Sequence, residues 1–418
     1  MFYFKEYHFD PDTHQASFCY VGVDGTEFTE VVQFTKSLLP INDELLDRAL
    51  FLSFILIGTS YYKANPTAHV RLDIPIDKSQ ALFFNTVYQE GLSQFAFENQ
   101  LTRQDLAHFT YTNAPQPQII HTTDYHGVLS LQSGGKDSLL TATLCQQQPT
   151  TYLYIGSSNH YPKILDQLGG TLQLLERTID REHLLQAAGM NGHVPITYII
   201  QSLALVQAII NHNSTILTSI GREGNEAHAY IDDLPVNHQW SKTWPAELAF
   251  AQYVHTYISP DIQVGSPLRG FSELKIAELF TKYCWQKYGH SFSSCNIANY
   301  RQNANNETLS WCGNCAKCAN TYLLFAPFIP AQELKTIFAG EDLFTKPSLT
   351  DTFKGLLGID GFMKPFECIG EIAELRKAYH LRQSDYGSLP FDVPESDFDS
   401  QEITQTQAFV QNFIKELA

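Results

Sequence analysis

A glycine-rich hexapeptide in the middle of the chain has the composition of an anion-binding loop. Its residues are Ser133, Gly134, Gly135, Lys136, Asp137 and Ser138. An apolar run precedes it and a helical pattern follows, which predicts a strand, a tight turn and a helix N-terminus. Glycines let backbone N–H groups approach a phosphate, and the helix dipole favours negative charge at this position. The lysine adds a cation and the serines add hydroxyl donors, so we expect a phosphate-binding site.

The loop does not have the Gly-x-x-x-x-Gly-Lys-Ser/Thr spacing of a Walker sequence. It resembles the PP-loop of the N-type ATP pyrophosphatases, which bind ATP, convert a carbonyl or carboxylate into an adenylate, and release pyrophosphate. The resemblance implies that residues 133–138 hold ATP, that Lys136 acts on the phosphates, and that Asp137 helps to place Mg²⁺. A plain strand-to-helix turn that happens to contain glycines is the alternative.

Four cysteines form a second group with chemical potential. They are Cys295, Cys312, Cys315 and Cys318, in the spacing Cys-x16-Cys-x2-Cys-x2-Cys. Four thiolates within one local segment match a tetrahedral structural zinc site, which needs no redox role. An iron–sulfur cluster and buried free thiols are the alternatives. The other cysteines, among them Cys368, are expected to be ordinary core or surface residues.

Composition limits the classes of partner and compartment. The formal net charge is −17, which argues against general nucleic-acid binding, since a polyanion needs a basic surface. The N-terminus has no signal-peptide pattern, and the longest apolar stretch, 49–58, is too short to span a bilayer. A cysteine cluster of metal-binding type fits a reducing compartment. We therefore expect a cytoplasmic protein that does not bind membranes.

The elements around the loop alternate between strand and helix. This pattern predicts an α/β fold with a doubly wound, mainly parallel sheet, in which ligands bind at the carboxyl ends of the strands. The expected strands are 128–132, 151–155, 172–175 and 215–220, and the expected helices are 138–146 and 195–211. Loops 133–138, 156–159 and 221–225 would then surround one crevice.

The flanking regions are expected to form separate units. Residues 1–120 read as an α+β domain, with a hairpin around Asp24-Gly25, helices 43–59 and 83–97, and a turn at 60–64. Residues 121–330 would form the ATP-binding domain with the zinc site, including a helix capped by Ser272 that ends at Tyr283. Residues 331–418 would add a helical extension, with a helix at 370–381 and a solvated acidic run at 392–402.

Motif order adds a family resemblance. A PP-loop followed by the four cysteines resembles the 7-cyano-7-deazaguanine synthases over the middle half of the chain. A closer resemblance, to the UDP-N-acetylmuramoyl-L-alanyl-L-glutamate epimerases, extends over nearly the whole chain. It rests on 57–64 (IGTSYYKA), 236–242 (VNHQWSK), 292–296 (FSSCN), 311–318 (WCGNCAKC) and 364–371 (KPFECIGE). The 221–228 loop departs from the pattern expected of that family.

The epimerase resemblance implies conversion of a terminal L-glutamate to D-glutamate on a UDP-linked muramoyl dipeptide, with ATP converted to AMP and pyrophosphate. Pyridoxal phosphate is not needed. The candidate catalytic residues are Lys136, Asp137, His238 and Lys242. Tyr61, Lys63 and Glu223 also have suitable acid–base chemistry, and Cys368 is a less favoured thiol base. For each acid–base candidate, a structural polar role is the alternative.

Three other functions compete with this interpretation. One is a different adenylating enzyme, such as an amide-forming or nitrile-forming enzyme that acts on a purine-like base. A tRNA-thiolating enzyme would need a basic surface, which the acidic balance disfavours. A zinc-stapled nucleotide sensor without catalysis would release no pyrophosphate with any substrate.

Overall fold

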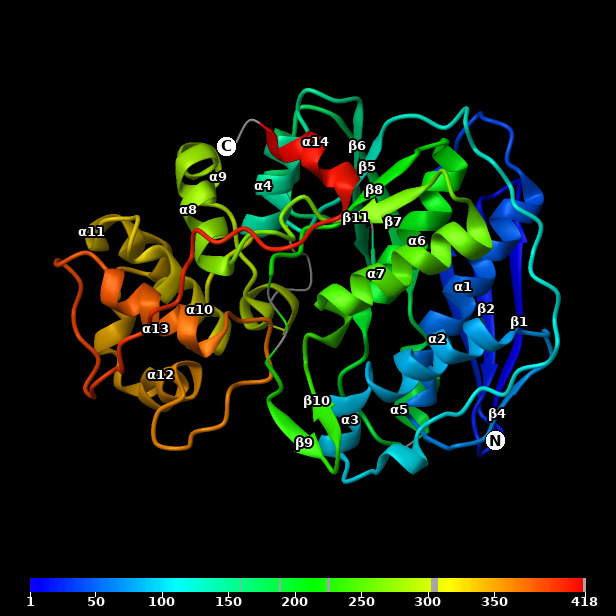
Figure 1. Ribbon diagram of the computed structural model, residues 1–418, viewed down its shortest axis with the longest axis horizontal. Coiled ribbons are helices and arrows are strands. Elements are labelled where there is room, and N and C mark those ends of the chain that lie inside the picture. The colour runs from blue at the N-terminus through cyan, green and yellow to red at the C-terminus, as the bar shows by residue number, and fades with distance from the viewer. Residues whose placement is uncertain (159, 188, 223, 225, 302–306, 416–418) are drawn as a thin grey trace.

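A nine-stranded sheet forms the centre of the computed structural model, which describes residues 1–418 except 159, 188, 223, 225, 302–306 and 416–418 (Figure 1). The strands lie in the order β11-β8-β5-β6-β7-β3-β2-β1-β4. Their bounds are β1 (Phe2–Asp10), β2 (Gln15–Val21), β3 (Glu27–Gln33), β4 (Val70–Leu72), β5 (Val128–Leu131), β6 (Thr150–Gly156), β7 (Thr171–Thr178), β8 (Thr215–Leu217) and β11 (Gln263–Gly265). From β11 to β7 every neighbouring pair is parallel, which confirms the predicted mainly parallel sheet.

The first three strands extend this sheet. The predicted hairpin is present, because β2 and β3 pair antiparallel on either side of Asp24-Gly25. β3 then pairs antiparallel with β7, so the sheet continues across the predicted domain boundary at residue 120. A separate two-stranded ribbon joins β9 (Ala229–Ile231) to β10 (Leu234–Val236).

Helices cover both faces of the sheet (Figure 1). They are α1 (Asp43–Tyr62), α2 (Lys78–Gln89), α3 (Ser93–Glu98), α4 (Lys136–Leu144), α5 (Arg181–Gln186), α6 (Ile196–Asn211), α7 (Trp244–Tyr253), α8 (Glu273–Tyr283), α9 (Trp285–Tyr288), α10 (Ala316–Phe325), α11 (Ala331–Leu334), α12 (Thr350–Leu357), α13 (Ile372–Leu381) and α14 (Gln411–Ile414). In β6, Leu153 joins the core built with α1 and α6, whereas Tyr152 and Tyr154 join the core built with α4, α8 and α10. This alternation is what a strand buried on both faces requires.

The apolar helix α1 is a core helix. By length and composition it is the one described helix that could cross a membrane, but 89% of its apolar window is buried within the protein. It begins at Asp43 after the cap Asn42, and it ends at Tyr62. The prediction of a turn at 60–64 is therefore wrong, because the helix continues through Tyr61 and Tyr62, whose rings are buried in the core.

The predicted helix at 83–97 is in fact two helices, α2 and α3, which are separated near Gly91. A β-carbon at Gly91 would lie 2.4 Å from the carbonyl oxygen of Val87, so any larger residue would clash with the backbone here. The helix capped by Ser272 is present as α8, which begins at Glu273 and ends at Tyr283 as expected. The helix ending at Leu381 is present as α13, which begins at Ile372 and not at residue 370.

The C-terminal segment returns to the edge of the sheet. The acidic run 392–402 consists of exposed and half-buried residues, as predicted. Beyond it, the Gln407 side chain donates to the carbonyl oxygen of Val264 in β11 at 2.9 Å, and Phe413 packs with Val128 and Leu217. Figure 1 shows α14 beside the parallel half of the sheet.

Candidate active site

The predicted strand, loop and helix are present at the centre of the parallel strands. β5 ends at Leu131, and α4 begins at Lys136 with Gly135 as its N-cap. Gly134 has a φ of +80°, and a β-carbon there would lie 2.6 Å from Leu309 Cδ1. The backbone N–H of Ser133 donates to Ser138 Oγ at 3.3 Å, which closes the turn in front of the helix N-terminus.

The loop forms one wall of a cavity of about 470 Å³. The other walls come from the ends of β6 and β8, the first turns of α6, and the segments around Lys242, Ser294 and Lys317. The lining residues are Leu131, Gln132, Ser133, Ser138, Tyr154, Ile155, Ile196, Thr197, Ile200, Thr218, Ser219, Ile220, Lys242, Ser293, Ser294, Asn296 and Lys317. The cavity thus occupies the carboxyl-end crevice that the parallel topology predicts.

Lys136, predicted to act on phosphates, is held by two carboxylates. Its ammonium lies 2.6 Å from Asp137 Oδ1 and 2.6 Å from Glu273 Oε2, and the residue is 8% exposed. Burial lowers the pKa of Lys136, but the two carboxylates outweigh burial and raise it above its ordinary value. Glu273 opens α8, so this ion pair fastens the loop to α8 on the α4 side of the sheet.

Two other lysines line the cavity, Lys242 and Lys317. The backbone of Lys242 is fixed by Arg269, whose Nη1 donates to the Lys242 carbonyl oxygen at 2.9 Å. Arg269 in turn forms a buried ion pair with Glu247 at 2.8 Å. A buried ion pair of this kind adds little net stability, because desolvation offsets its Coulomb energy. Its main effect is to hold Arg269, and through it the Lys242 backbone, in one position.

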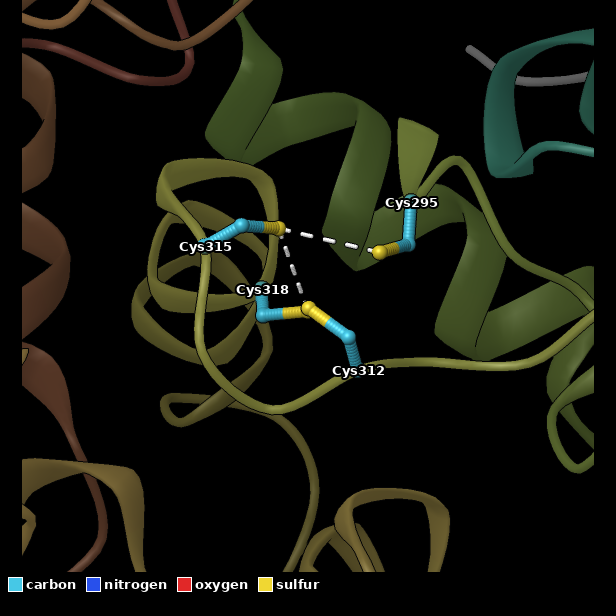
Figure 2. Close-up of side chains that lie close together, drawn as sticks. All are labelled: Cys295, Cys312, Cys315 and Cys318. Atoms are coloured by element: carbon cyan, nitrogen blue, oxygen red, sulfur yellow. Dashed lines mark hydrogen bonds between the residues drawn. The ribbon is translucent and has the colours of Figure 1, made fainter. Parts of the chain in front are cut away.

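The four predicted cysteines meet in space, as Figure 2 shows. Their Sγ atoms all lie within 4.8 Å of one another. Cys315 Sγ is 3.7 Å from Cys295 Sγ and 3.5 Å from Cys318 Sγ, while Cys312 and Cys318 are 3.8 Å apart. A zinc–sulfur bond of about 2.3 Å gives a tetrahedron with edges of roughly 3.8 Å, so the thiols fit one zinc ion. An iron–sulfur cluster divides its four thiolates among two or four irons, so thiolates on different irons would lie farther apart than these do.

The cysteine cluster is joined to the glycine-rich loop. The backbone N–H of Ser293 donates to the carbonyl oxygen of Gly134 at 3.3 Å, and the Ser293 hydroxyl accepts from the backbone N–H of Cys295 at 3.1 Å. Asn296 and Lys317, which lie next to cysteines of the cluster, line the cavity. A metal held by these thiolates would therefore also fix one wall of the cavity.

Three histidines gather beside Lys242. The rings of His193 and His238 lie 4.3 Å apart, and those of His228 and His238 lie 6.4 Å apart, between centroids. Burial, reinforced by neighbouring positive groups, lowers the pKa of His193 to about 3 and the pKa values of His228 and His238 to about 4. All three rings are therefore neutral near pH 7. Sequence reasoning missed His193 and His228, which lie outside any recognisable spacing.

Glu367 links this histidine cluster (His193, His228 and His238) to the cavity. The side chain of Asn296, which lines the cavity, donates to Glu367 Oε2 at 3.0 Å. The Glu367 carboxylate acts on the His238 ring by raising its pKa against the effect of burial. Lys242, on the cavity wall, has the opposite effect, because its positive charge lowers the pKa values of both His193 and His238. The predicted candidates His238 and Lys242 therefore lie close enough for the lysine charge to act on the ring.

The remaining acid–base candidates have other environments. Tyr61 is buried and donates to Glu30, which also pairs with Arg177 at 2.5 Å, so Tyr61 belongs to a structural network. Lys63 donates to the side chain of Asn191 at 2.8 Å, next to the segment that carries His193. Glu223 lies outside the described residues. Cys368 is half-buried, and it is not part of the cysteine cluster.

Fold and site together define a class: an α/β protein with a glycine-rich anion loop, a cavity at the strand ends, and a four-thiol metal site. Two family models match the chain, the MurL N-terminal domain over residues 1–266 and the MurL C-terminal domain over residues 291–388. The chain belongs to the MurL family.

Relatives from three bacteria carry one name, UDP-N-acetyl-alpha-D-muramoyl-L-alanyl-L-glutamate epimerase. The protein of Salinispora tropica is 32% identical over 402 residues, which cover 93% of this chain and 86% of the relative. The protein of Micromonospora sp. is 32% identical over 387 residues, covering 89% and 84%. The protein of Xanthomonas oryzae pv. oryzae is 30% identical over 380 residues, covering 88% and 82%.

Proposed function

We propose that this protein epimerises the terminal L-glutamate of UDP-N-acetylmuramoyl-L-alanyl-L-glutamate to D-glutamate, in peptidoglycan precursor synthesis in the cytoplasm. The reaction consumes ATP and forms AMP and pyrophosphate. Family membership and the names of the relatives support the epimerisation. One structural observation supports the ATP dependence: the glycine-rich loop and Lys242, whose charge acts on His193 and His238, line the same cavity.

Adenylation solves the chemical difficulty of this epimerisation. The α-proton of a carboxylate is barely acidic, because its removal places a second negative charge beside the first. An acyl-adenylate has lost that charge, and its carbonyl can accept the electron pair left by the proton. A base then removes the proton, an acid returns it to the other face, and water hydrolyses the adenylate. This sequence needs no pyridoxal phosphate.

The loop supplies the nucleotide site in this proposal, as in the PP-loop enzymes. Backbone amides at the α4 N-terminus, with the hydroxyls of Ser133 and Ser138, hold the phosphates. Lys242 and Lys317 add positive charge from the facing wall. Asp137 is the carboxylate nearest the loop for Mg²⁺, which would neutralise phosphate charge. Lys136 orders the loop through its two carboxylates, and contacts phosphate if ATP draws it away from them.

His238 is the proposed base, and Lys242 is the cation that stabilises the developing enolate. A neutral imidazole at pH 7 accepts a proton directly, and burial keeps His238 in that form. Cys295, Cys312, Cys315 and Cys318 would hold a structural zinc ion, which supplies no step of the reaction and fixes the cavity wall.

The alternative function is an amide-forming or nitrile-forming adenylating enzyme, like the 7-cyano-7-deazaguanine synthases. Product analysis with ATP and the L-glutamate-terminated precursor in deuterated, oxygen-labelled water separates the two. We expect D-glutamate with deuterium at Cα, AMP and pyrophosphate without ADP, and one solvent oxygen in the product carboxylate or in AMP. Inversion without ATP consumption would exclude adenylation. AMP formation without inversion would favour the alternative.

A further inference from the structure

A chain of side-chain hydrogen bonds runs from helix α3 to the ring of His238. Gln94 Nε2 donates to Glu98 Oε1 at 2.8 Å, one turn further along the same helix. Gln94 Oε1 faces His238 Nδ1 at 2.6 Å. Gln94 lies in the predicted helix 83–97, but neither Gln94 nor Glu98 is among the candidate site residues predicted from the sequence.

The chemistry of Glu98, Gln94 and His238 determines which group donates and which accepts in each of these hydrogen bonds. A carboxylate only accepts hydrogen bonds, so Gln94 must turn its NH₂ group toward Glu98. Its carbonyl oxygen therefore faces the imidazole, and that oxygen has only lone pairs to offer. His238 Nδ1 must then carry the proton. In the neutral ring this leaves Nε2 as the nitrogen with a free lone pair.

The backbone next to His238 is tied to the same helix. The backbone N–H of Asn237 donates to the hydroxyl of Ser93 at 3.3 Å, so two successive residues of α3 hold two successive residues of the histidine segment. Gln94 is only 6% exposed, which limits competition from water for its amide. The ring is thereby fixed in both place and orientation.

We propose that Gln94 is a positioning residue, which holds His238 with its proton on Nδ1 and so leaves Nε2 as the basic nitrogen. This inference rests on the proposed function for the role of His238. The α3 helix thus contributes to the site through the histidine, without contacting substrate itself. The same logic applies to general bases in other enzymes, where the partner of one ring nitrogen determines the reactivity of the other.

The charged and titratable groups around His238 come from several elements. They are His193, His228, Glu98, Lys242, Lys317 and Glu367. The variants proposed below leave these groups in place, so a change in the tautomer or the pKa of His238 reports on the Gln94 side chain. Glu98 is the one exception, because it also contacts the Gln94 side chain.

The test compares Gln94→Leu with Gln94→Glu in the full-length protein, using nitrogen-15 NMR of labelled histidine and steady-state kinetics. Gln94→Leu removes the acceptor, so both tautomers should appear, and kcat should fall roughly 10- to 100-fold with KM for ATP unchanged. Gln94→Glu keeps an acceptor on Nδ1–H but adds negative charge. It should retain the Nδ1–H tautomer and raise the His238 pKa by about one unit or more. The acid limb of kcat/KM should move upward by the same amount.

Gln89→Leu is the matched control, since Gln89 lies at the end of the neighbouring helix α2 and accepts from Arg103 at 2.9 Å. It should leave tautomer and kinetics unchanged. A wild-type ring protonated on Nε2, or a Gln94→Glu variant whose His238 titration does not move, overturns the proposal. So does an active Gln94→Leu variant with wild-type kcat. If the wild type does not epimerise at all, the proposed function fails, while the tautomer measurement still decides the role of Gln94.

Discussion

At the scale of single residues, we expect anion binding by the glycine-rich loop to depend on backbone groups more than on Lys136. Lys136 pairs with Asp137 and Glu273, whereas no side chain of the described residues caps the N-terminus of α4, which begins directly after the loop. The two glycines of the loop have different roles. Gly134 adopts a positive φ, whereas a β-carbon at Gly135 would meet Ser133 Oγ and Ser294 Cβ only at 3.6 Å and 3.7 Å.

This difference gives a matched pair of variants. Gly135→Ala should fold normally but weaken ATP binding by roughly tenfold, because its methyl group would occupy the approach of a phosphate. Gly134→Ala should destabilise the protein by on the order of 1–3 kcal/mol, since its φ is unfavourable for alanine and the methyl group would clash with Leu309. Calorimetric ATP titration and thermal melting measure the two effects. Wild-type ATP affinity in both variants would show that the loop is not the nucleotide site.

The histidine cluster predicts an unusual pH dependence. The pKa of His238 is about 4 instead of 6.5, so the base remains unprotonated at mildly acidic pH. We expect kcat/KM to show no decline attributable to His238 down to about pH 5.5, where a histidine with an ordinary pKa would be mostly protonated. His238→Asn should abolish inversion at every pH. A decline with a midpoint near 6.5 would contradict the neutral-base assignment.

The same shifts affect stability. His193, His228 and His238 bind protons more weakly in the folded chain than in the unfolded chain. Their contribution to folding is therefore present above about pH 6.5 and is lost as the pH falls toward 4. Melting curves recorded across this range separate acid destabilisation from loss of activity.

At the scale of elements, the cysteine cluster joins the α10 N-terminus to the segment that contacts the glycine-rich loop. Cys295 lies two residues after Ser293, which binds the Gly134 carbonyl group, and Lys317 lies between Cys315 and Cys318. Loss of a metal would release both segments at once. The four-thiol site is thus expected to matter for ATP binding as well as for folding.

We expect about one zinc ion per chain, and Cys315→Ser should reduce the zinc content and lower Tm by at least about 5 °C. ATP affinity of the remaining folded protein should fall, because the cavity wall around Asn296 and Lys317 loses its anchor. Elemental analysis, melting and ATP titration measure the three effects. Cys19→Ser, a half-buried thiol outside the cluster, serves as the control. Metal-free protein with unchanged Tm would rule out a structural metal.

At the scale of the whole molecule, one sheet carries both the glycine-rich loop and the N-terminal region. β3 pairs with β7, and helices α1 and α6 share a single core on one face. From the sequence, residues 1–120 and 121–330 are assigned to separate domains. Their division into independent domains stays a prediction, and the shared sheet and core favour one folding unit.

Separating the chain at residue 120 tests this directly. Expressed alone, 1–120 and 121–418 should each be insoluble or unfolded, because each exposes a strand edge and half of the α1–α6 core. Coexpression should recover some soluble complex. Two cooperatively folded fragments with their own melting transitions would instead support independent domains.

Local sequence was sufficient for the features whose chemistry is contained in a short segment. The strand–glycine–helix order of residues 128–144, the hairpin at Asp24-Gly25 and the four cysteines were all predicted correctly. Each depends on turn conformation, side-chain periodicity or ligand spacing, which neighbouring residues determine. The exact limits of α1 and the break between α2 and α3 did not follow, because burial of Tyr61 and the close approach at Gly91 involve packing partners elsewhere.

Only the tertiary structure decided which polar side chains meet. His193, His228 and Gln94 are far apart along the chain and have no informative neighbours, yet all three surround or contact His238. Lys136 looked like a free cation in sequence, but α8 brings Glu273 within 2.6 Å of it. The pKa values and hydrogen-bond directions that decide acid–base chemistry arise from burial and from charges contributed by other elements. Sequence fixes the residue types, whereas folding determines their distances and their access to water.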